Sequence, residues 1–259
     1  MQLDQIIDYK KHPVSTTEFR NQCKDKLDKI GALTLTDFLQ PAAIESIRRD
    51  GDNNQHLAYF TKSAHNVYLS PPDQNLPMDH PRNREVTSSK GCITTDQIPA
   101  NSALTALYDS IEFRDFLCAV LGIEALYEYA DPLSSINLHY ASAGQELGWH
   151  FDNSSFAITL LIQAPQGGGQ FKYVKDLRNA EAGDMNYDNV ASVMDGNTAP
   201  DTLELAPGTL SLFRVRNSMH RVTPVEGNTT RMLVVLAYNT KSGVSLSESA
   251  RMTFYGRLE

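Results

Sequence analysis

The sequence predicts a mainly β fold, a sandwich or jelly roll of short strands with helices packed outside it. Two observations predict this class. From Ile136 onward the apolar residues follow the two-residue period of strands, and Gly, Pro and Asn separate the segments. Before Ile136 they recur mainly at helical spacing. The composition shifts nowhere sharply, so we expect one domain over residues 1–259: a mainly helical flank with loops (1–135), the jelly-roll core (136–240) and a C-terminal segment (241–259).

The flank is expected to contain three helices and one short strand. The helices end near residue 30, begin at Pro41 and span roughly residues 102–121. Alternating apolar residues predict the strand at 32–39. Residues 51–91 are polar and rich in Pro and Asn, so we expect loops there, lying over a surface or the mouth of a site.

The second half is expected to supply the strands of the core. Each strand is a short apolar or alternating run that ends at a turn signal. The expected strands are residues 136–140, 156–163, 169–174, 201–206, 208–215, 220–225 and 231–239. The segment 175–200 breaks this pattern, and we expect it to cover one end of the core.

Charge and composition exclude several function classes. The chain has 31 acidic and 23 basic residues, a net charge of −8, and no basic run. It is therefore a poor candidate for binding nucleic acid or an anionic membrane surface, and we expect a small-molecule substrate. The three cysteines have no CxxC spacing, the N-terminal segment does not resemble a signal peptide, and the longest apolar run is too short to span a bilayer. A cytoplasmic location is expected.

His150, Asp152 and His220 form the most informative pattern. His150 and Asp152 are two residues apart, so on a strand both side chains point to the same face. His220 follows seventy residues later, after several further strands. Two histidines and one carboxylate are the protein ligands of non-haem Fe(II) sites that leave positions open for a cosubstrate and dioxygen. We therefore predict an iron site at these three residues.

Arg231 strengthens this interpretation. It stands eleven residues after His220 and begins an apolar strand. Its guanidinium is suited to bind a carboxylate through two parallel hydrogen bonds. A His-x-Asp triplet arises often by chance, and a lone histidine on a strand is usually structural. The prediction therefore rests on the combination of all four residues at this spacing.

With this combination, residues 136–238 resemble the Fe(II)/2-oxoglutarate-dependent oxygenases, whose fold is a double-stranded β-helix, a cupin-like jelly roll. Within that superfamily the chain is most similar to the bacterial halogenases and hydroxylases of free amino acids, typified by the lysine halogenases. The closer similarity rests on the segments DHPRN (79–83), DQIP (96–99), YADPL (129–133), WHFD (149–152), GGGQF (167–171) and TFYGR (253–257).

The resemblance implies a reaction and its cofactors. Fe(II), with 2-oxoglutarate and dioxygen, would hydroxylate an unactivated C–H bond and release succinate and carbon dioxide. Halogenating members carry Gly or Ala at the carboxylate position, which frees a site for chloride, whereas this chain carries Asp152. Hydroxylation is therefore expected. Arg231 would hold the distal carboxylate of 2-oxoglutarate, and Tyr140 and Asn137 are further candidates for binding it.

The resemblance also suggests substrate-binding residues. Arg82 and Tyr255, the latter in the C-terminal segment near the site, would bind the carboxylate of a free amino acid. The alternative is that Arg82 and the neighbouring candidates Arg84 and Arg257 pair with local acids such as Asp79 or Glu85. Asn153 is the third candidate, and it stands where a lysine enzyme would carry an acid for the substrate amine. Lysine is therefore disfavoured, and another amino acid or a derivative fits better.

Three other functions stay open. Desaturation or cyclisation could follow from the same cofactors. A non-catalytic, cupin-like metal-binding protein is a second possibility, although it would have no need for Arg231. A dioxygenase or isomerase that does not use 2-oxoglutarate is the third. His139 is expected to be a core or supporting residue, because its side-chain parity on the strand is opposite to that of Tyr140.

Overall fold

The structure is a computed structural model that describes all 259 residues. The helices are α1 (Leu3–Ile6), α2 (Thr17–Ile30), α3 (Pro41–Asn54), α4 (Ala103–Asp109), α5 (Ile111–Leu121), α6 (Tyr187–Met194) and α7 (Glu248–Tyr255), with short 3-10 turns at Gln55–Leu57 and Thr95–Gln97. The strands are β1 (Ala32–Leu35), β2 (Tyr59–Asn66), β3 (Glu85–Ile93), β4 (Ile136–Ala141), β5 (Leu147–His150), β6 (Ala157–Gln163), β7 (Gly167–Gly168), β8 (Phe171–Val174), β9 (Asp201–Leu203), β10 (Leu210–Phe213), β11 (Met219–Val222), β12 (Val225–Glu226) and β13 (Arg231–Leu236).

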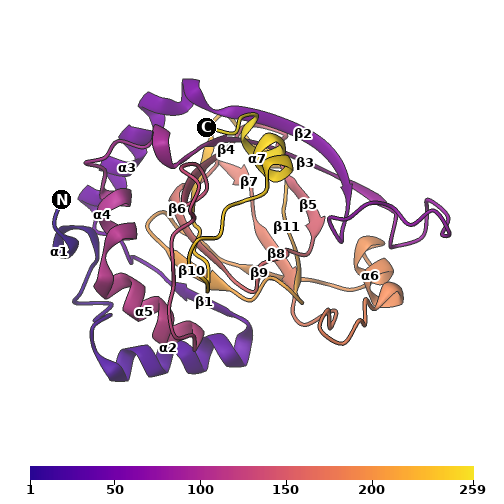
Figure 1. Cartoon of the computed structure of the whole chain (residues 1–259), viewed down its shortest axis with the longest axis horizontal. Helices are drawn as coiled ribbons and strands as arrows, with labels where there is room; N and C mark the ends of the chain where they lie inside the picture. The colour runs from indigo at the N-terminus through magenta and orange to yellow at the C-terminus, as the bar shows by residue number, and fades with distance from the viewer.

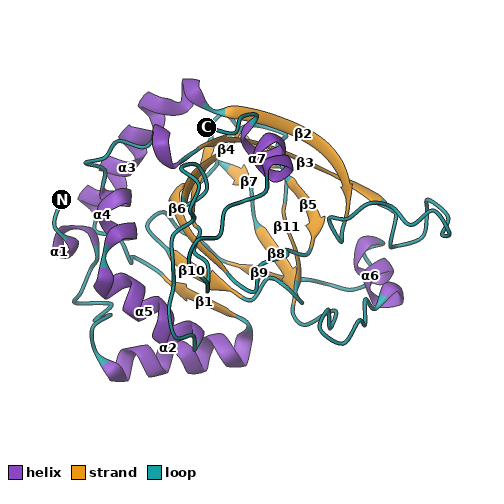
Figure 2. Ribbon diagram, in the orientation of Figure 1, coloured by secondary structure: helices purple, strands orange, loops and turns teal.

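One large antiparallel sheet dominates the fold. Its strand order is β1-β10-β6-β13-β4-β3-β5-β11-β8-β9, with β2 paired to β3, and β7 and β12 form a separate small sheet. Figure 2 shows the large sheet curling round, with β6 and β10 on one side and β5, β8 and β11 on the other. Phe213 on β10 and His220 on β11 are not on neighbouring strands, yet their ring centroids are 5.6 Å apart. The expected mainly β, jelly-roll class is confirmed.

Helices cover the outer face of one half of this sheet (Figure 1). The largest apolar cluster contains side chains of α2–α5 and every second residue of the central strands, for example Leu138 on β4, Leu160 on β6 and Val234 on β13. Alternation along a strand then turns the intervening residues toward the concave face. On β4 and β13 these are Asn137, His139, Arg231, Leu233 and Val235, and Leu233 is paired with His139.

Two sequence-based expectations for the flank were wrong. Residues 51–91 are not loops throughout, because β2 and β3 occupy much of this segment and pair along their full length. β2 is mostly exposed, so its residues are polar and lack the apolar alternation of a half-buried strand. The helix expected at 102–121 is two helices, because Ser110 has extended backbone and its side chain caps α5 by accepting a hydrogen bond from the amide of Phe113.

A second apolar cluster closes the opposite side of the molecule. It joins Trp149 on β5 and Phe151 just after it to Tyr68 in the β2–β3 connection and to Val190 and Val193 on α6. The Tyr68 hydroxyl donates a hydrogen bond to the carbonyl of Met185 at 2.9 Å. The segment 175–200 therefore packs over this end of the sheet, as expected. None of the helices is long and apolar enough to cross a membrane.

Candidate active site

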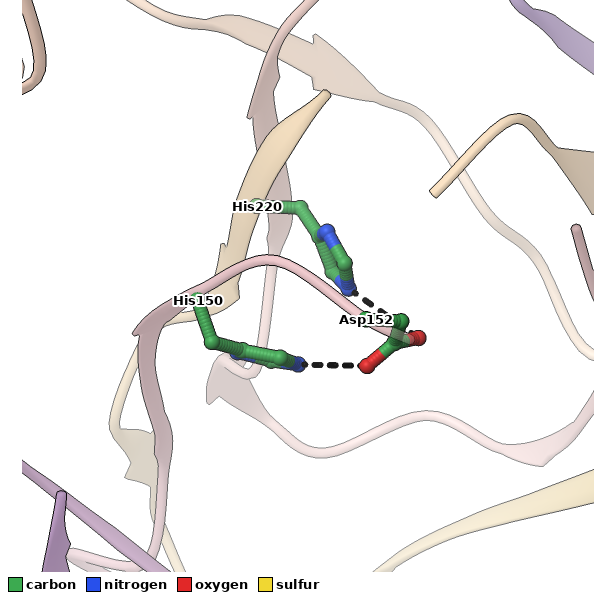
Figure 3. A group of neighbouring side chains, drawn as sticks. All are labelled: His150, Asp152 and His220. Atoms are coloured by element: carbon green, nitrogen blue, oxygen red, sulfur yellow. Dashed lines mark ion pairs between the residues drawn. The ribbon is translucent and has the colours of Figure 1, made fainter. Parts of the chain in front are cut away.

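Strands β5 and β11 position the three expected metal ligands. His150 ends β5 and is the direct cross-strand partner of His220 on β11, so both rings leave the same face of the sheet. Asp152 lies just beyond β5 and points back between them (Figure 3). One carboxylate oxygen is 3.5 Å from His150 Nε2, and the other is 3.7 Å from His220 Nε2. The three ligand atoms lie within 4.8 Å of one another, so one ion could contact all three.

Backbone carbonyls fix the tautomer of both histidines. His150 Nδ1 is 2.7 Å from the carbonyl oxygen of Gly148, and His220 Nδ1 is 3.0 Å from that of Ser218. A carbonyl can only accept, so each Nδ1 carries the hydrogen and donates it. This leaves the lone pair of each Nε2 facing Asp152. Such anchoring is typical of histidines that bind metal.

A hydrogen-bond relay supports the position of β5. His65 Nδ1 donates to the carbonyl of Asn66 at 3.0 Å, so its Nε2 accepts from the Ser88 hydroxyl at 2.7 Å. Ser88 in turn accepts from the amide of Gly148 at 3.0 Å. The relay thus ends at the residue whose carbonyl anchors His150.

The surroundings keep His150 uncharged and His220 buried. Burial, followed by the nearby His220, lowers the pKa of His150 to about 4. Aromatic rings of Phe171 and Phe213 pack against His220, which is 5% exposed. Neutral imidazoles and a carboxylate are the donor set that a divalent transition metal requires. The residues present therefore fit Fe(II).

Arg231 is a buried cation without an acidic partner. It is 6% exposed, burial alone lowers the pKa of its guanidinium to about 10, and it forms no ion pair or side-chain hydrogen bond. An unpaired charge is costly to bury, so such a position is suited to receive a ligand of opposite charge. A carboxylate is the natural match for its planar donor fork. Arg231 therefore fits the distal carboxylate of 2-oxoglutarate.

Lys90 and His139 lie next to these residues on the concave face. Lys90 Nζ is 3.3 Å from Nδ1 and 3.2 Å from Nε2 of His139. Burial and the charges of Lys90 and Arg231 hold the pKa of His139 well below its usual range. Burial lowers the pKa of Lys90, and the charge of Asp152 opposes this shift. The charge of Lys90 in turn lowers the pKa of His150, so Lys90 lies in the field of the metal ligands.

A cavity of about 180 Å³ begins at Lys90 and His139. Its walls include Asn137 and Val235 from the concave face and Phe254 and Tyr255 from α7. The Tyr255 hydroxyl donates to Asn137 Oδ1 at 2.9 Å. A larger cavity of about 260 Å³ lies near Tyr108 and Glu128, but no residue of the triad lines it.

The structure brings some of the other predicted residues together and not others. Asn137 and Tyr255 meet in the cavity. Tyr140 lies on the opposite face of β4, fully buried in the helix-covered core, where its hydroxyl donates to the carbonyl of Gly51 at 2.7 Å. Arg82 packs over Tyr68 and donates to the carbonyl of Pro71. Asn153 follows Asp152 and is exposed.

Sequence reasoning missed Lys90 as a site residue and did not identify which face of β4 is turned toward the site. His139, expected in a core or supporting role, faces the site, whereas Tyr140 does not. The alternation was visible, since Asn137 and His139 share one face of β4, but both faces are mostly buried, so the pattern alone does not say which face is turned to the site. Arg82 forms no ion pair, and the acids that pair with Arg84 and Arg257 are Asp195 and Asp96, which are distant in the sequence.

Comparison with solved structures identifies the class of fold. The chain is similar to an oxidoreductase of the 2OG-Fe(II) oxygenase family from Burkholderia pseudomallei (TM-score 0.54, 13% identity, 87% of this chain and 93% of that chain). It is also similar to the non-heme alpha-ketoglutarate-dependent carbocyclase SnoK from nogalamycin biosynthesis (0.58, 10%, 84% and 82%) and to a prolyl hydroxylase from Trichoplax adhaerens (0.56, 14%, 85% and 89%). The protein thus has the double-stranded β-helix fold of 2-oxoglutarate-dependent iron oxygenases.

The family is defined by sequence. The model of the family Halogenase D matches residues 73–253, and the chain belongs to this family. No curated protein matches the sequence. The family, the fold and the His–Asp–His site together support Fe(II), 2-oxoglutarate and dioxygen as the cofactor and cosubstrates.

Proposed function

We propose that the protein is a 2-oxoglutarate-dependent iron oxygenase that hydroxylates a C–H bond of a free amino acid or an amino-acid derivative, releasing succinate and carbon dioxide. The observation that carries the choice of hydroxylation is Asp152. Its two oxygens face the Nε2 atoms of both histidines, so the carboxylate occupies the position that Gly or Ala leaves open in halogenating enzymes. A halide therefore has no place among the protein-side ligands, although the family is named for halogenation.

Different residues of the chain would bind the metal, bind the cosubstrate and exclude water. His150, Asp152 and His220 would hold Fe(II), which with the bound cosubstrates supplies the oxidation of a C–H bond that no side chain can carry out. Arg231 would orient 2-oxoglutarate by its distal carboxylate, and Asn137 remains a candidate for the same ligand. The apolar cluster around Trp149 and the segment 175–200 excludes water from one side of the site.

Substrate binding is proposed for three residues from different parts of the chain. Tyr255 supports this role best, because it lines the cavity beside Lys90 and His139. One buried guanidinium nitrogen of Arg82 has no hydrogen-bond partner. It could donate a hydrogen bond to a substrate carboxylate. Asn153 adjoins Asp152 and is exposed toward the solvent.

The first test is an anaerobic optical titration of the metal-free protein with Fe(II) and 2-oxoglutarate. A visible charge-transfer band that needs both components is expected for the chelate. Iron binding without the band would contradict the use of 2-oxoglutarate and favour a non-catalytic, cupin-like metal-binding protein.

The second test separates hydroxylation from halogenation. The protein is incubated with Fe(II), 2-oxoglutarate, air and chloride, and a panel of free amino acids is scored by succinate release and product mass. Products that gain one oxygen atom are expected, and chlorinated products from the unaltered protein would contradict the proposal. Asp152→Gly should abolish hydroxylation, whereas Asp201→Gly, at an exposed acid on β9, should leave it unchanged.

A further inference from the structure

The cavity beside the candidate metal site carries charge of one sign. Lys90 and His139 both line the cavity, and the charge of Lys90 interacts with that of the metal ligand Asp152. No aspartate or glutamate lines the cavity. Asp152 is the carboxylate whose charge acts on Lys90, and its two oxygens already face the two histidines. A substrate ammonium would find no counter-charge here, whereas an anionic group would.

Lys90 also lacks a partner that could neutralise it. It forms no ion pair, and its only hydrogen-bond partner is His139. His139 is uncharged, because burial and then the positive charges of Lys90 and Arg231 hold its pKa well below the usual range. An ammonium group has three hydrogens to donate, and the imidazole can accept only one of them. The half-buried Lys90 therefore keeps donors free on the cavity side, where the ring of Phe254 is 5.9 Å away.

Lys90 and Arg231 are two separate cationic positions. Lys90 is on β3, Arg231 is on β13, and His139 on β4 stands between them in the sheet order. In the proposed function Arg231 is matched by the distal carboxylate of 2-oxoglutarate. One cationic position is then left over, and it faces the cavity on the side of α7.

We propose that Lys90 binds a carboxylate of the substrate and that the cavity closed by Phe254 and Tyr255 receives the end of the molecule that carries it. This inference rests on the proposed function and names the chemical class of its substrate. The carboxylate has two possible sources, the α-carboxylate of the amino acid or a terminal carboxylate on its side chain. Neither source requires an acidic residue in the pocket, and a terminal side-chain carboxylate would exclude a cationic side chain such as that of lysine.

The test compares Lys90→Met with Lys62→Met, an equal loss of charge at an exposed lysine on the neighbouring strand β2. Each protein is first titrated anaerobically with Fe(II) and 2-oxoglutarate. Ligands are then added, and their affinity is read from the change in the charge-transfer band. Aspartate against asparagine and glutamate against glutamine probe a side-chain carboxylate. The α-amides of the same amino acids probe the α-carboxylate, and lysine and leucine serve as cationic and neutral references.

In the unaltered protein we expect one of the two carboxylates to matter, so that its replacement by an amide weakens binding by about ten- to a hundredfold. Lys90→Met should remove that preference and leave the affinity for 2-oxoglutarate within about twofold, the size of effect expected when no contact is lost. Lys62→Met should behave as the unaltered protein.

Three results would overturn the proposal: no response to any carboxylate-bearing ligand, an acid-over-amide preference that survives in Lys90→Met, or a loss of 2-oxoglutarate affinity in that variant. The last would assign Lys90 to the cosubstrate. Absence of the band in the unaltered protein is a different outcome, because it contradicts the proposed function itself.

Discussion

The hydroxyl of Tyr255 donates a hydrogen bond to Asn137 Oδ1, and this contact ties the last helix of the chain to the concave face of β4. The amide nitrogen of Asn137 donates to the carbonyls of Leu133 and Ile136, so the whole side chain is held. Helix α7 therefore forms a fixed wall of the cavity.

Tyr255→Phe should lower the free energy of unfolding by about 1–3 kcal/mol, because the buried Asn137 oxygen would lose its donor. Chemical denaturation measures this, with the half-exposed Tyr127→Phe as a control. In combination with Asn137→Leu the two effects should not add, since both changes remove the same bond. Full additivity of the two losses in unfolding free energy would show that the hydrogen bond contributes nothing to stability.

Arg231→Met should have opposite effects on binding and on stability. The affinity for 2-oxoglutarate should fall by about tenfold or more, read from the charge-transfer band, while Fe(II) still binds. The free energy of unfolding should stay the same or rise by up to about 4 kcal/mol, because a buried charge without a partner is removed. The exposed Arg49→Met is the control. Unchanged 2-oxoglutarate binding would remove Arg231 from the site.

The metal-free protein should lose stability as the pH falls from about 6.5 to about 4. The pKa of His150 is lowered from 6.5 to about 4 by burial and by His220, so in this range the unfolded chain binds the proton and the folded chain does not. The loss should approach about 3 kcal/mol and level off below pH 4, at about 1.4 kcal/mol per pKa unit.

The measurement is the difference between the unaltered protein and His150→Gln in denaturation at each pH, with a chelator present. Taking the difference cancels the carboxylates that titrate in the same range. Parallel curves for the two proteins would contradict the assignment of a neutral His150.

Gly148→Ala should weaken metal binding without touching a ligand. A Cβ at Gly148 would stand 2.6 Å from the backbone oxygen of Thr87, so β5 must move away from β3. Gly148 also carries the carbonyl that anchors His150. Iron content after dialysis is the readout, and Leu147→Ala, on the same strand, is a control for general disturbance of β5. Normal iron content in Gly148→Ala would show that the site tolerates this shift.

The metal ligands were predictable because their chemistry is rare and their spacing is fixed by strand geometry. His150 and Asp152 were expected on one strand, and the structure places Asp152 just after it, yet the two still converge. Strand geometry alone did not predict whether Tyr140 or His139 faces the site. Hydrophobicity separates Asn137 and His139 from the apolar face of β4, but both faces are covered, one by helices and one by the site, so burial does not say which one the site uses.

Lys90 is a second site residue that the sequence did not predict. It lies on β3, whose polar residues resemble a loop and whose partner β2 is an exposed edge. A lysine on such a strand is ordinarily solvated. Only the pairing of β3 with β4, between segments more than forty residues apart, brings Lys90 beside His139. Contacts of this kind depend on the tertiary arrangement and leave no local signal.

The cross-strand pairing of His150 with His220 makes a bound ion a removable crosslink. It would join two points of the chain seventy residues apart and so close a long loop, which restricts the unfolded ensemble as well as the folded one. A slip of one residue between β5 and β11 would turn one ring to the other face and break this link. Release of the ion should therefore loosen these two strands first, while the helix-covered half of the sheet, which carries none of the three metal ligands, keeps its protection.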